Sequence, residues 1–523
     1  MRPPKLSLAW LSSFSGLLLF TACSLTPSGN LAPPTSTATL TETPSFVSPS
    51  SEPFHTPSPT ERPTSFPSLT PATPSPTAPP TLLPSASPTA TPFTGVDFRR
   101  DEMQVLDTLQ ISAIDLRSPH LIILNINDRS SAGNLATALP DSELAVLYYA
   151  NARNPQRLIP VLELHGSALG NIYPSADGSS LVYLEERVSG ALSVYVMTLR
   201  EGFRLRVLSL LESAPFGIQL LPSWSPDGDR FALALPSNHD MDVYVFEMAG
   251  NQWQRYTHGR GVDFHPVWSP DGRTIAYLSA LPPCKDLPPA TAEPCTRQEP
   301  TFPRKGQLHL LDTTTRESRR ISDHWIREPP VWLNDAEISF LSETGIDGDS
   351  ARSIWLADIH TGNLRQLTPG IPAPLSGFEN VFWNEEGTAM VLQNAGQENI
   401  IWLLASDGSV LGSTAEYHFP RYGMRASWSA DHSRVAIGGV EGQCPYGVLV
   451  FNQELALISQ GTIPPMCEPQ YAPDGSFLAF EGINSRLDGR IHVYLASQNG
   501  YGTRILTSDL RGQNRLVGWA WAP

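Results

Sequence analysis

Short apolar runs separated by polar turns follow one another from about residue 105 to the end of the chain. Runs such as residues 144–149, 231–235 and 274–278 have the length of strands and lack helical periodicity. They are nearly continuous in hydrophobicity instead of alternating, which is typical of strands covered on both faces. The pattern therefore predicts an all-β fold in which each sheet is packed between two others.

The apolar runs belong to a repeated unit that opens on an aromatic residue and a tight turn. The clearest copies are Trp224-Ser225-Pro226-Asp227-Gly228 and Trp268-Ser269-Pro270-Asp271-Gly272. The opening aromatic residues of successive units are Tyr173, Trp224, Trp268, Trp332, Trp383, Trp428, Tyr471 and Trp521. Most of these positions are spaced about 40 to 50 residues apart, as in the blades of a β-propeller.

Each unit supplies four strands. Ser-Pro-Asp-Gly is typical of a type I turn, because proline fixes φ at its second position and glycine suits the fourth. A strand follows at once, for example residues 337–341, and a second comes after a variable loop, for example residues 353–356. A short polar turn then leads to an edge strand such as residues 365–368. We name the four strands A to D, beginning with the aromatic one.

These repeats resemble the WD40-like β-propeller repeat of the TolB type, which has the same Trp-Ser-Pro-Asp-Gly opening and an Ile-Tyr-Val-type second strand ending near Leu-Thr. The resemblance extends from about residue 168 to the C-terminus. It implies a propeller fold and, because TolB is a docking protein, a role in binding envelope proteins. The same repeat also forms the non-catalytic propellers of peptidases.

The number of blades depends on how the chain ends are paired. Seven full units lie between Tyr173 and Trp521, and Trp521 lies in one further A strand. Residues 121–124, 144–149 and 157–160 are expected to form strands B, C and D without an opening motif. Pairing the last strand with these three would close the ring and remove its free edge, giving eight blades. Seven blades with an accessory N-terminal sheet are the alternative.

The first 95 residues are expected to direct and tether the propeller. Residues 1–22 have a charged start and an apolar middle, as in a signal peptide, and they end in Phe20-Thr21-Ala22 before Cys23. This ending resembles the lipobox of bacterial lipoproteins, which implies a lipid on Cys23 and an extracytoplasmic, membrane-anchored location. An ordinary secretory signal with an incidental cysteine is the alternative. Residues 23–95 are rich in Pro, Ser and Thr and are expected to form a disordered linker to a propeller domain at 96–523.

Charge and motifs narrow the classes of function. Lys and Arg number 35 against 51 Asp and Glu, a net charge of −16, which disfavours a nucleic-acid partner. The sequence has no nucleophile elbow, no HExxH, no phosphate loop and no spacing typical of metal ligands. We therefore expect no cofactor or metal and name no catalytic residue. A polysaccharide hydrolase or lyase, with acidic residues such as Asp263, Glu328 and Glu379 converging, stays open as an alternative.

The four remaining cysteines are expected to form two disulfides outside the cytoplasm. Cys284 and Cys295 fall in one long B–C loop, whereas Cys444 and Cys467 come from a B–C loop and the following D–A loop of adjacent blades. Each bridge would contribute about 3 kcal/mol by the chain-entropy estimate. Free buried thiols are the alternative.

Charged residues recur where the chain enters the A strands and would, if the blades are in register, meet at one mouth of the central channel. They are Asp263, His265, Arg327, Glu328, Glu379, Arg425 and Glu468. This mouth is our candidate binding site, with a solvated charged rim as the alternative. The aromatic residue of each A strand is interpreted as packing between blades instead of as a glycan-stacking surface.

The sequence therefore predicts a monomeric, surface-anchored lipoprotein whose TolB-like propeller is a non-catalytic binding or scaffold module for an envelope protein. Extracellular recognition of a glycan or peptide is the alternative function, beside the carbohydrate-active enzyme already named.

Overall fold

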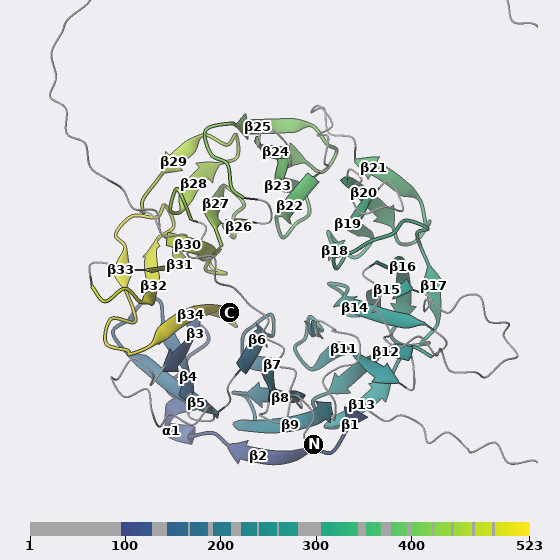
Figure 1. Ribbon diagram of the computed structural model, residues 1–523, viewed down its shortest axis with the longest axis horizontal. Coiled ribbons are helices and arrows are strands. Elements are labelled where there is room, and N and C mark those ends of the chain that lie inside the picture. The colour runs from purple at the N-terminus through teal and green to yellow at the C-terminus, as the bar shows by residue number, and fades with distance from the viewer. Residues whose placement is uncertain are drawn as a thin grey trace, which may run out of the picture. The chain divides into compact units, whose positions relative to one another are not determined.

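The described residues form a ring of eight four-stranded antiparallel units (Figure 1). The computed structural model describes residues 96–127, 144–165, 168–186, 192–210, 221–237, 240–258, 261–280, 305–343, 352–367, 378–394, 400–420, 423–440, 444–462, 466–483 and 487–522. These residues belong to the compact unit Ser87–Pro523. The predicted all-β propeller of eight blades is thereby confirmed.

The blades are numbered from the one that contains both ends of the propeller, with their strands given from A to D. Blade 1 contains β34 (Gln513–Ala520), β3 (His120–Asn127), β4 (Leu144–Asn151) and β5 (Leu158–His165); blade 2 contains β6 (Ala168–Pro174), β7 (Ser180–Glu186), β8 (Leu192–Thr198) and β9 (Phe203–Leu210). Blade 3 contains β10 (Ser223–Trp224), β11 (Arg230–Ser237), β12 (Asp240–Glu247) and β13 (Gln252–Arg255); blade 4 contains β14 (Val262–Trp268), β15 (Thr274–Ala280), β16 (Gln307–Asp312) and β17 (Ser318–Arg320).

The second half of the ring repeats the same order. Blade 5 contains β18 (Val331–Trp332), β19 (Glu337–Glu343), β20 (Arg352–Asp358) and β21 (Leu364–Leu367); blade 6 contains β22 (Phe378–Trp383), β23 (Ala389–Asn394), β24 (Ile401–Ala405) and β25 (Val410–Thr414). Blade 7 contains β26 (Met424–Trp428), β27 (Arg434–Gly439), β28 (Leu449–Asn452) and β29 (Leu457–Ser459); blade 8 contains β30 (Met466–Tyr471), β31 (Phe477–Ile483), β32 (Ile491–Ser497) and β33 (Arg504–Ile505).

Blade 1 closes the ring by joining strands from the two ends of the propeller. The C-terminal strand β34 pairs antiparallel with β3, with His120 opposite Ala520 and Ile126 opposite Gln513. A buried amide pair reinforces this seam, since Asn125 Nδ2 donates to Asn514 Oδ1 at 2.8 Å. The predicted closure is therefore confirmed, and it leaves no open sheet edge between the first and last blades.

The Ser-Pro-Asp-Gly turns form as their sequence predicts. In blade 3 the amide of Gly228 donates to the carbonyl of Ser225 at 2.9 Å, which closes the turn. The Asp227 carboxylate accepts from the Ser225 hydroxyl and from the amide of Asp229. Gly228 has φ +71°, a left-handed conformation that glycine adopts without steric cost. The turn thus fixes the A–B hairpin through contacts between residues close in sequence.

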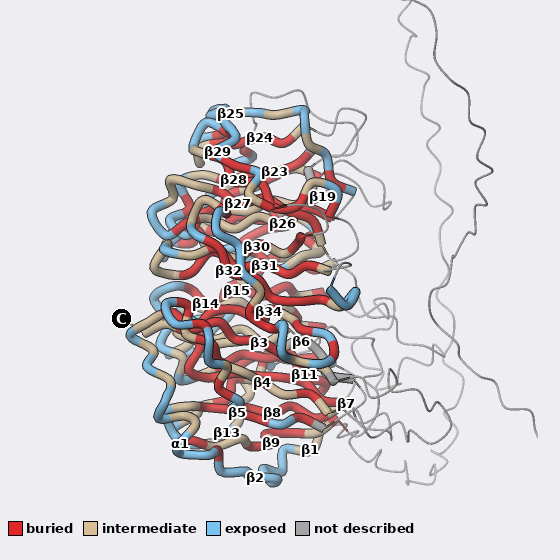
Figure 2. Tube along the Cα trace, turned by 90° about the vertical axis from the view of Figure 1, so that its left-hand side faces the viewer, coloured by how far each residue is buried: buried red, intermediate tan, exposed pale blue. Residues whose placement is uncertain are grey.

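The aromatic residues of the A strands join neighbouring blades. The indole Nε1 of Trp224 in blade 3 donates to the carbonyl of Tyr173 in blade 2 at 2.9 Å. Trp332 and Trp428 make the same bond to Val267 and Phe382 of the blades before them. The B strands of the blades are buried along most of their length, whereas outer D strands such as β17 and β25 are largely exposed (Figure 2). This arrangement agrees with a packing role for these aromatic residues.

A segment that the repeat pattern did not predict lies along the outer edge of blade 2. β1 (Val96–Asp97) and β2 (Asp101–Val105) both pair with β9, and the short helix α1 (Thr108–Ile111) follows. Arg206 of β9 forms ion pairs with Asp101 and, at 2.8 Å, with Glu102. Two further strand segments thus cover the edge of this blade.

Several predicted features lie outside the described residues. They are the signal peptide at 1–22, Cys23, the linker up to residue 95 and the cysteines Cys284 and Cys295. Within the described part of the chain, no helix has the length and hydrophobicity needed to cross a membrane.

Candidate functional site

The two faces of the ring differ in the length of their connections. The A–B connections are short, as between β22, ending at Trp383, and β23, beginning at Ala389. The B–C connections on the other face are often longer, as between β15, ending at Ala280, and β16, beginning at Gln307. In an antiparallel blade the D–A connections lie on the same face as the B–C connections. The predicted channel-mouth residues are therefore near the beginnings of the A strands, toward this loop-rich face.

Several A strands carry a β-bulge near this face, among them β6, β14, β22 and β30, and the last three have described side chains at the bulge. The pairing register shifts between Phe264 and Val267 in β14, between Glu379 and Phe382 in β22, and between Cys467 and Gln470 in β30. The first unpaired residue of each bulge has a positive φ: His265 (+53°), Asn380 (+55°) and Glu468 (+51°). Left-handed backbone is costly for residues other than glycine, by roughly 1–2 kcal/mol. Bulges of this kind redirect side chains and are common beside functional sites.

A cavity of about 310 Å³ lies between blades 5 and 6 and is lined by residues of their inner strands. Its polar groups include Glu328, Arg352, Asn380 and Arg425, and its apolar wall includes Phe382. Arg352 is only 6 % exposed, and its Nη1 donates to Glu328 Oε1 at 2.9 Å. Glu328 thus holds the buried guanidinium of Arg352 in a fixed position beside the cavity.

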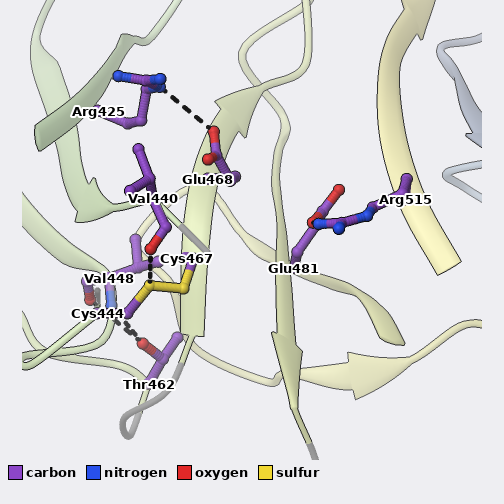
Figure 3. Close-up of a disulfide and its surroundings, with 9 residues drawn as sticks. All are labelled: Arg425, Val440, Cys444, Val448, Thr462, Cys467, Glu468, Glu481 and Arg515. Atoms are coloured by element: carbon purple, nitrogen blue, oxygen red, sulfur yellow. Dashed lines mark hydrogen bonds and ion pairs between the residues drawn. A yellow bond between two sulfur atoms is a disulfide. The ribbon is translucent and has the colours of Figure 1, made fainter. Parts of the chain in front are cut away.

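Arg425, from the A strand of blade 7, contributes the second guanidinium. Its Nε lies 3.5 Å from Oε2 of Glu468 in blade 8, and its side chain is 43 % exposed (Figure 3). Its Nη1 also donates to the carbonyl of Met424 at 3.1 Å. A guanidinium has five N–H donors, so these contacts leave donors for a ligand in the cavity that Arg425 lines.

A buried carboxylate lies deeper in blade 8, on the B strand beside Glu468. Glu481 Oε1 accepts from the amide of Leu516 at 2.5 Å, and its Oε2 lies 3.2 Å from Nη1 of Arg515 (Figure 3). Leu516 and Arg515 belong to β34, so this carboxylate connects blade 8 to blade 1. Burial raises the pKa of Glu481 to about 7, despite the opposing effects of the Leu516 amide and Arg515.

This carboxylate should make stability depend on pH. Because the pKa of Glu481 is higher in the folded than in the unfolded chain, the folded state binds more protons between about pH 4.5 and 7. The contribution of Glu481 is therefore full below that range and is lost as pH rises through 7. We expect Glu481→Gln, which keeps an acceptor for Leu516 but cannot ionise, to flatten the unfolding free energy between pH 5 and 8. Parallel urea titrations of both proteins across this range would measure the effect, and identical pH profiles would contradict it.

The disulfide predicted between Cys444 and Cys467 is present. It joins the segment after β27 in blade 7 to the A strand of blade 8, and Cys467 directly precedes Glu468 (Figure 3). Nearby, the hydroxyl of Thr462 accepts from the amide of Val448 at 2.6 Å. The bridge thus lies where blades 7 and 8 present Arg425 and Glu468.

Comparison with known proteins identifies the type of propeller. Residues 172–281 match the family model described as the TolB beta propeller domain. These residues lie in blades 2 to 4, and for this similarity we call the ring a TolB-type propeller. A TolB homolog of Chlorobium luteolum is 29 % identical over 106 residues, which are 20 % of this chain and 22 % of that protein.

Two further relatives share shorter or more divergent segments with the TolB-type propeller. Dipeptidyl-peptidase 5 of Porphyromonas gingivalis is 25 % identical over 232 residues, covering 39 % of this chain and 31 % of the relative. The Tol-Pal system protein TolB of Francisella tularensis is 40 % identical over 55 residues, covering 10 % and 13 %. The chain thus spans less than a third of each of these three relatives, so the similarity supports a binding or scaffold module and leaves whole-protein activities open.

The TolB-type propeller brings only some of the predicted mouth residues together. Glu328 and Arg425 line one cavity, and Arg425 pairs with Glu468. Asp263 instead accepts from the Ser279 hydroxyl within blade 4, at 2.6 Å. Burial lowers the pKa of His265 to about 4, so this residue is neutral at pH 7.

The two other predicted residues have no assigned place in the cavity. Arg327 is half-buried just before β18. Glu379 is placed by its backbone pairing with Gln393, and its side chain is outside the described part.

Sequence reasoning missed Arg352, Asn380 and Glu481. Arg352 begins the apolar strand β20, and Glu481 directly follows the apolar residues of β31, so a charge at the end of an apolar run was an available signal. No comparable signal marks Asn380, whose role depends on a bulge.

The chemistry of the site favours binding. Glu328, Glu468 and Glu481 each face an arginine, at 2.9, 3.5 and 3.2 Å. Among the residues that the structure describes, no group of three or more His, Cys, Asp or Glu side chains is arranged to hold a metal ion. Paired charges beside an apolar wall suit recognition of a ligand that combines charge with hydrophobic surface.

Proposed function

We propose that this chain is a lipid-anchored, extracytoplasmic binding module whose TolB-type propeller docks an envelope protein on its loop-rich face. In this proposal the signal peptide occupies residues 1–22, the lipid is on Cys23 and residues 24–95 tether the propeller. The Cys444–Cys467 disulfide supports an oxidising compartment, because such bonds are rare in the cytoplasm. The Tol-Pal system relative supports a partner in the cell envelope.

The cavity between blades 5 and 6 is the observation that carries the proposal. It combines apolar side chains with charged groups from blades 5 and 7. Arginine and tryptophan, present here as Arg425 and Trp383, are enriched in protein-binding hot spots. The propeller acts without chemistry in this proposal, as a monomer that holds its partner at the channel mouth.

Site-specific photo-crosslinking tests the location of the partner. Val331 lines the cavity and is 43 % exposed, whereas Leu457, equally exposed, lies on the outer strand β29 of blade 7. A photoreactive phenylalanine analogue in place of Val331 should give a discrete adduct with one envelope protein, and the same analogue at Leu457 should give none. The adducts would be compared by electrophoresis and mass spectrometry after irradiation in the producing cells.

Two outcomes would contradict the proposal. An adduct from Leu457 but not from Val331 would place the partner on the outside of the ring. A lack of protein adducts at both positions would replace the docking function with recognition of a smaller ligand.

A further inference from the structure

We propose that the cavity between blades 5 and 6 binds a carboxylate-bearing side chain together with an adjacent apolar side chain from a peptide segment of the docked protein. This inference rests on the proposed docking function and specifies the chemistry that the partner presents. Three features of the cavity carry it: the guanidinium groups, the amide of Asn380 and the apolar wall.

The guanidinium groups provide the charge that recognises a carboxylate. Arg352 is buried and fixed by Glu328, so it contributes a positive group that costs no ordering when a ligand arrives. Arg425 is more exposed, and its Nε is 3.5 Å from Glu468, longer than a strong charge-assisted hydrogen bond. A ligand carboxylate can therefore approach Arg425 from the cavity and form a shorter contact than the one Glu468 makes.

Asn380 supplies a donor that points to the same kind of ligand. It lines the cavity from the bulge in β22, where its φ is +55°. Its Nδ2 is buried and has no acceptor within the described part of the chain. A buried donor without an acceptor is unfavourable, so an acceptor oxygen of a ligand is the group that this position requires.

The apolar wall favours a peptide over a glycan. Val331, Leu341 and Phe382 line the cavity beside the charged groups. A sugar presents many hydroxyl groups, each of which would need a polar partner on burial, and these side chains offer none. The aliphatic or aromatic side chain of a peptide can lose water against this wall at no such cost.

The size of the cavity limits how much of the partner enters it. A volume of about 310 Å³ is at the lower end of the range for ligand pockets, about 300–1,000 Å³. A pair of side chains from an extended segment fits this volume better than a folded surface does. The inference therefore specifies a short acidic–apolar motif and not a whole domain.

Two small peptides that differ only in charge test the inference on the full chain. The probes are N-acetyl-Leu-Glu-amide and N-acetyl-Leu-Gln-amide, titrated by calorimetry at low salt. We expect the glutamate probe to bind about tenfold more tightly, as one charge-assisted hydrogen bond implies. Raising the salt concentration should weaken the glutamate probe more than the glutamine probe.

Variants assign that preference to the cavity. Arg425→Gln should remove the preference for the glutamate probe, and Asn380→Ala should weaken its binding. Arg273→Gln is the matched control. Arg273 lies on the opposite face and is 84 % exposed, and its contact with Asp271 is weak, because the two charged groups are 4.0 Å apart. This control should keep the full preference, and unfolding curves would verify that all three variants are folded.

The results also separate this inference from the proposed docking function. Equal binding of the two probes, or a preference that survives Arg425→Gln, would overturn the inference. If the Val331 adduct then formed as strongly in an Arg425→Gln background, docking would stand without the acidic motif. If the chain with Arg425 intact bound neither probe and also gave no adduct from the analogue at Val331, the inference and the docking function would be overturned together.

Discussion

Replacing Gly178 by alanine should destabilise the propeller by about 2–4 kcal/mol, because Gly178 packs against β34, the strand that closes the ring. Gly178 ends the A–B turn of blade 2 with φ +65°, and an added Cβ would lie 2.5 Å from both Ala520 Cα and Trp519 O of β34. Both are backbone atoms, so the clash cannot be relieved by the movement of a flexible side chain. The same turn holds the chain end, since the amide of Trp521 donates to the carbonyl of Asp177 at 2.9 Å.

Gly362→Ala separates the cost of the backbone conformation from that of the close approach. Gly362 also has a left-handed φ, +73°, but nothing lies within 4 Å of its added Cβ. This control should cost only about 1 kcal/mol, the usual cost of alanine in that conformation. Urea unfolding of both variants gives the comparison. Equal losses of unfolding free energy in the two variants would mean that β34 does not pack against the turn at Gly178.

The sequence was sufficient for the architecture because each blade is specified by local chemistry. The Ser225-Pro226-Asp227-Gly228 turn is closed by bonds between residues a few positions apart, and such turns recur in register. The ring closure was also predicted, because pairing the lone A strand at one end with the strands at the other end removes the free sheet edge. β1 and β2 were not predicted, because their pairing with β9 has no counterpart in the repeat.

The site was less predictable because its geometry arises between blades. Arg425 and Glu468 were both selected from the sequence, but their 3.5 Å contact depends on how blades 7 and 8 pack. Arg352 reaches the cavity from a C strand, whereas the charged residues that recur in the sequence lie at the A strands. Asn380 depends on a bulge that shifts the register of β22. The repeated residues therefore predict the blades, whereas the residues of the site are those that depart from the repeat.

Removing the Cys444–Cys467 disulfide should be comparably damaging, at about 3 kcal/mol. The bridge closes a loop with a sequence separation of 23, and the chain-entropy model gives that magnitude for a loop of this length. The cost arises mainly in the unfolded chain, so the double variant Cys444→Ala, Cys467→Ala should fold to the same ring and unfold at lower urea concentration. Circular dichroism and urea unfolding under oxidising conditions would measure both properties.

Measuring the stability of both proteins with and without reductant would assign the loss of stability to this bridge. Treating the unmutated protein with reductant should lower its stability by at least as much as the double substitution does. If reductant lowered the stability of the double variant further, that loss would be assigned to a disulfide between Cys284 and Cys295, the predicted second pair. The bridge anchors Cys467, which directly precedes Glu468, so its removal should loosen the left-handed bulge and the contact between Glu468 and Arg425. We therefore expect the affinity for the glutamate probe to change in the double variant. Unchanged stability and unchanged affinity would show that the bridge constrains neither the fold nor the mouth.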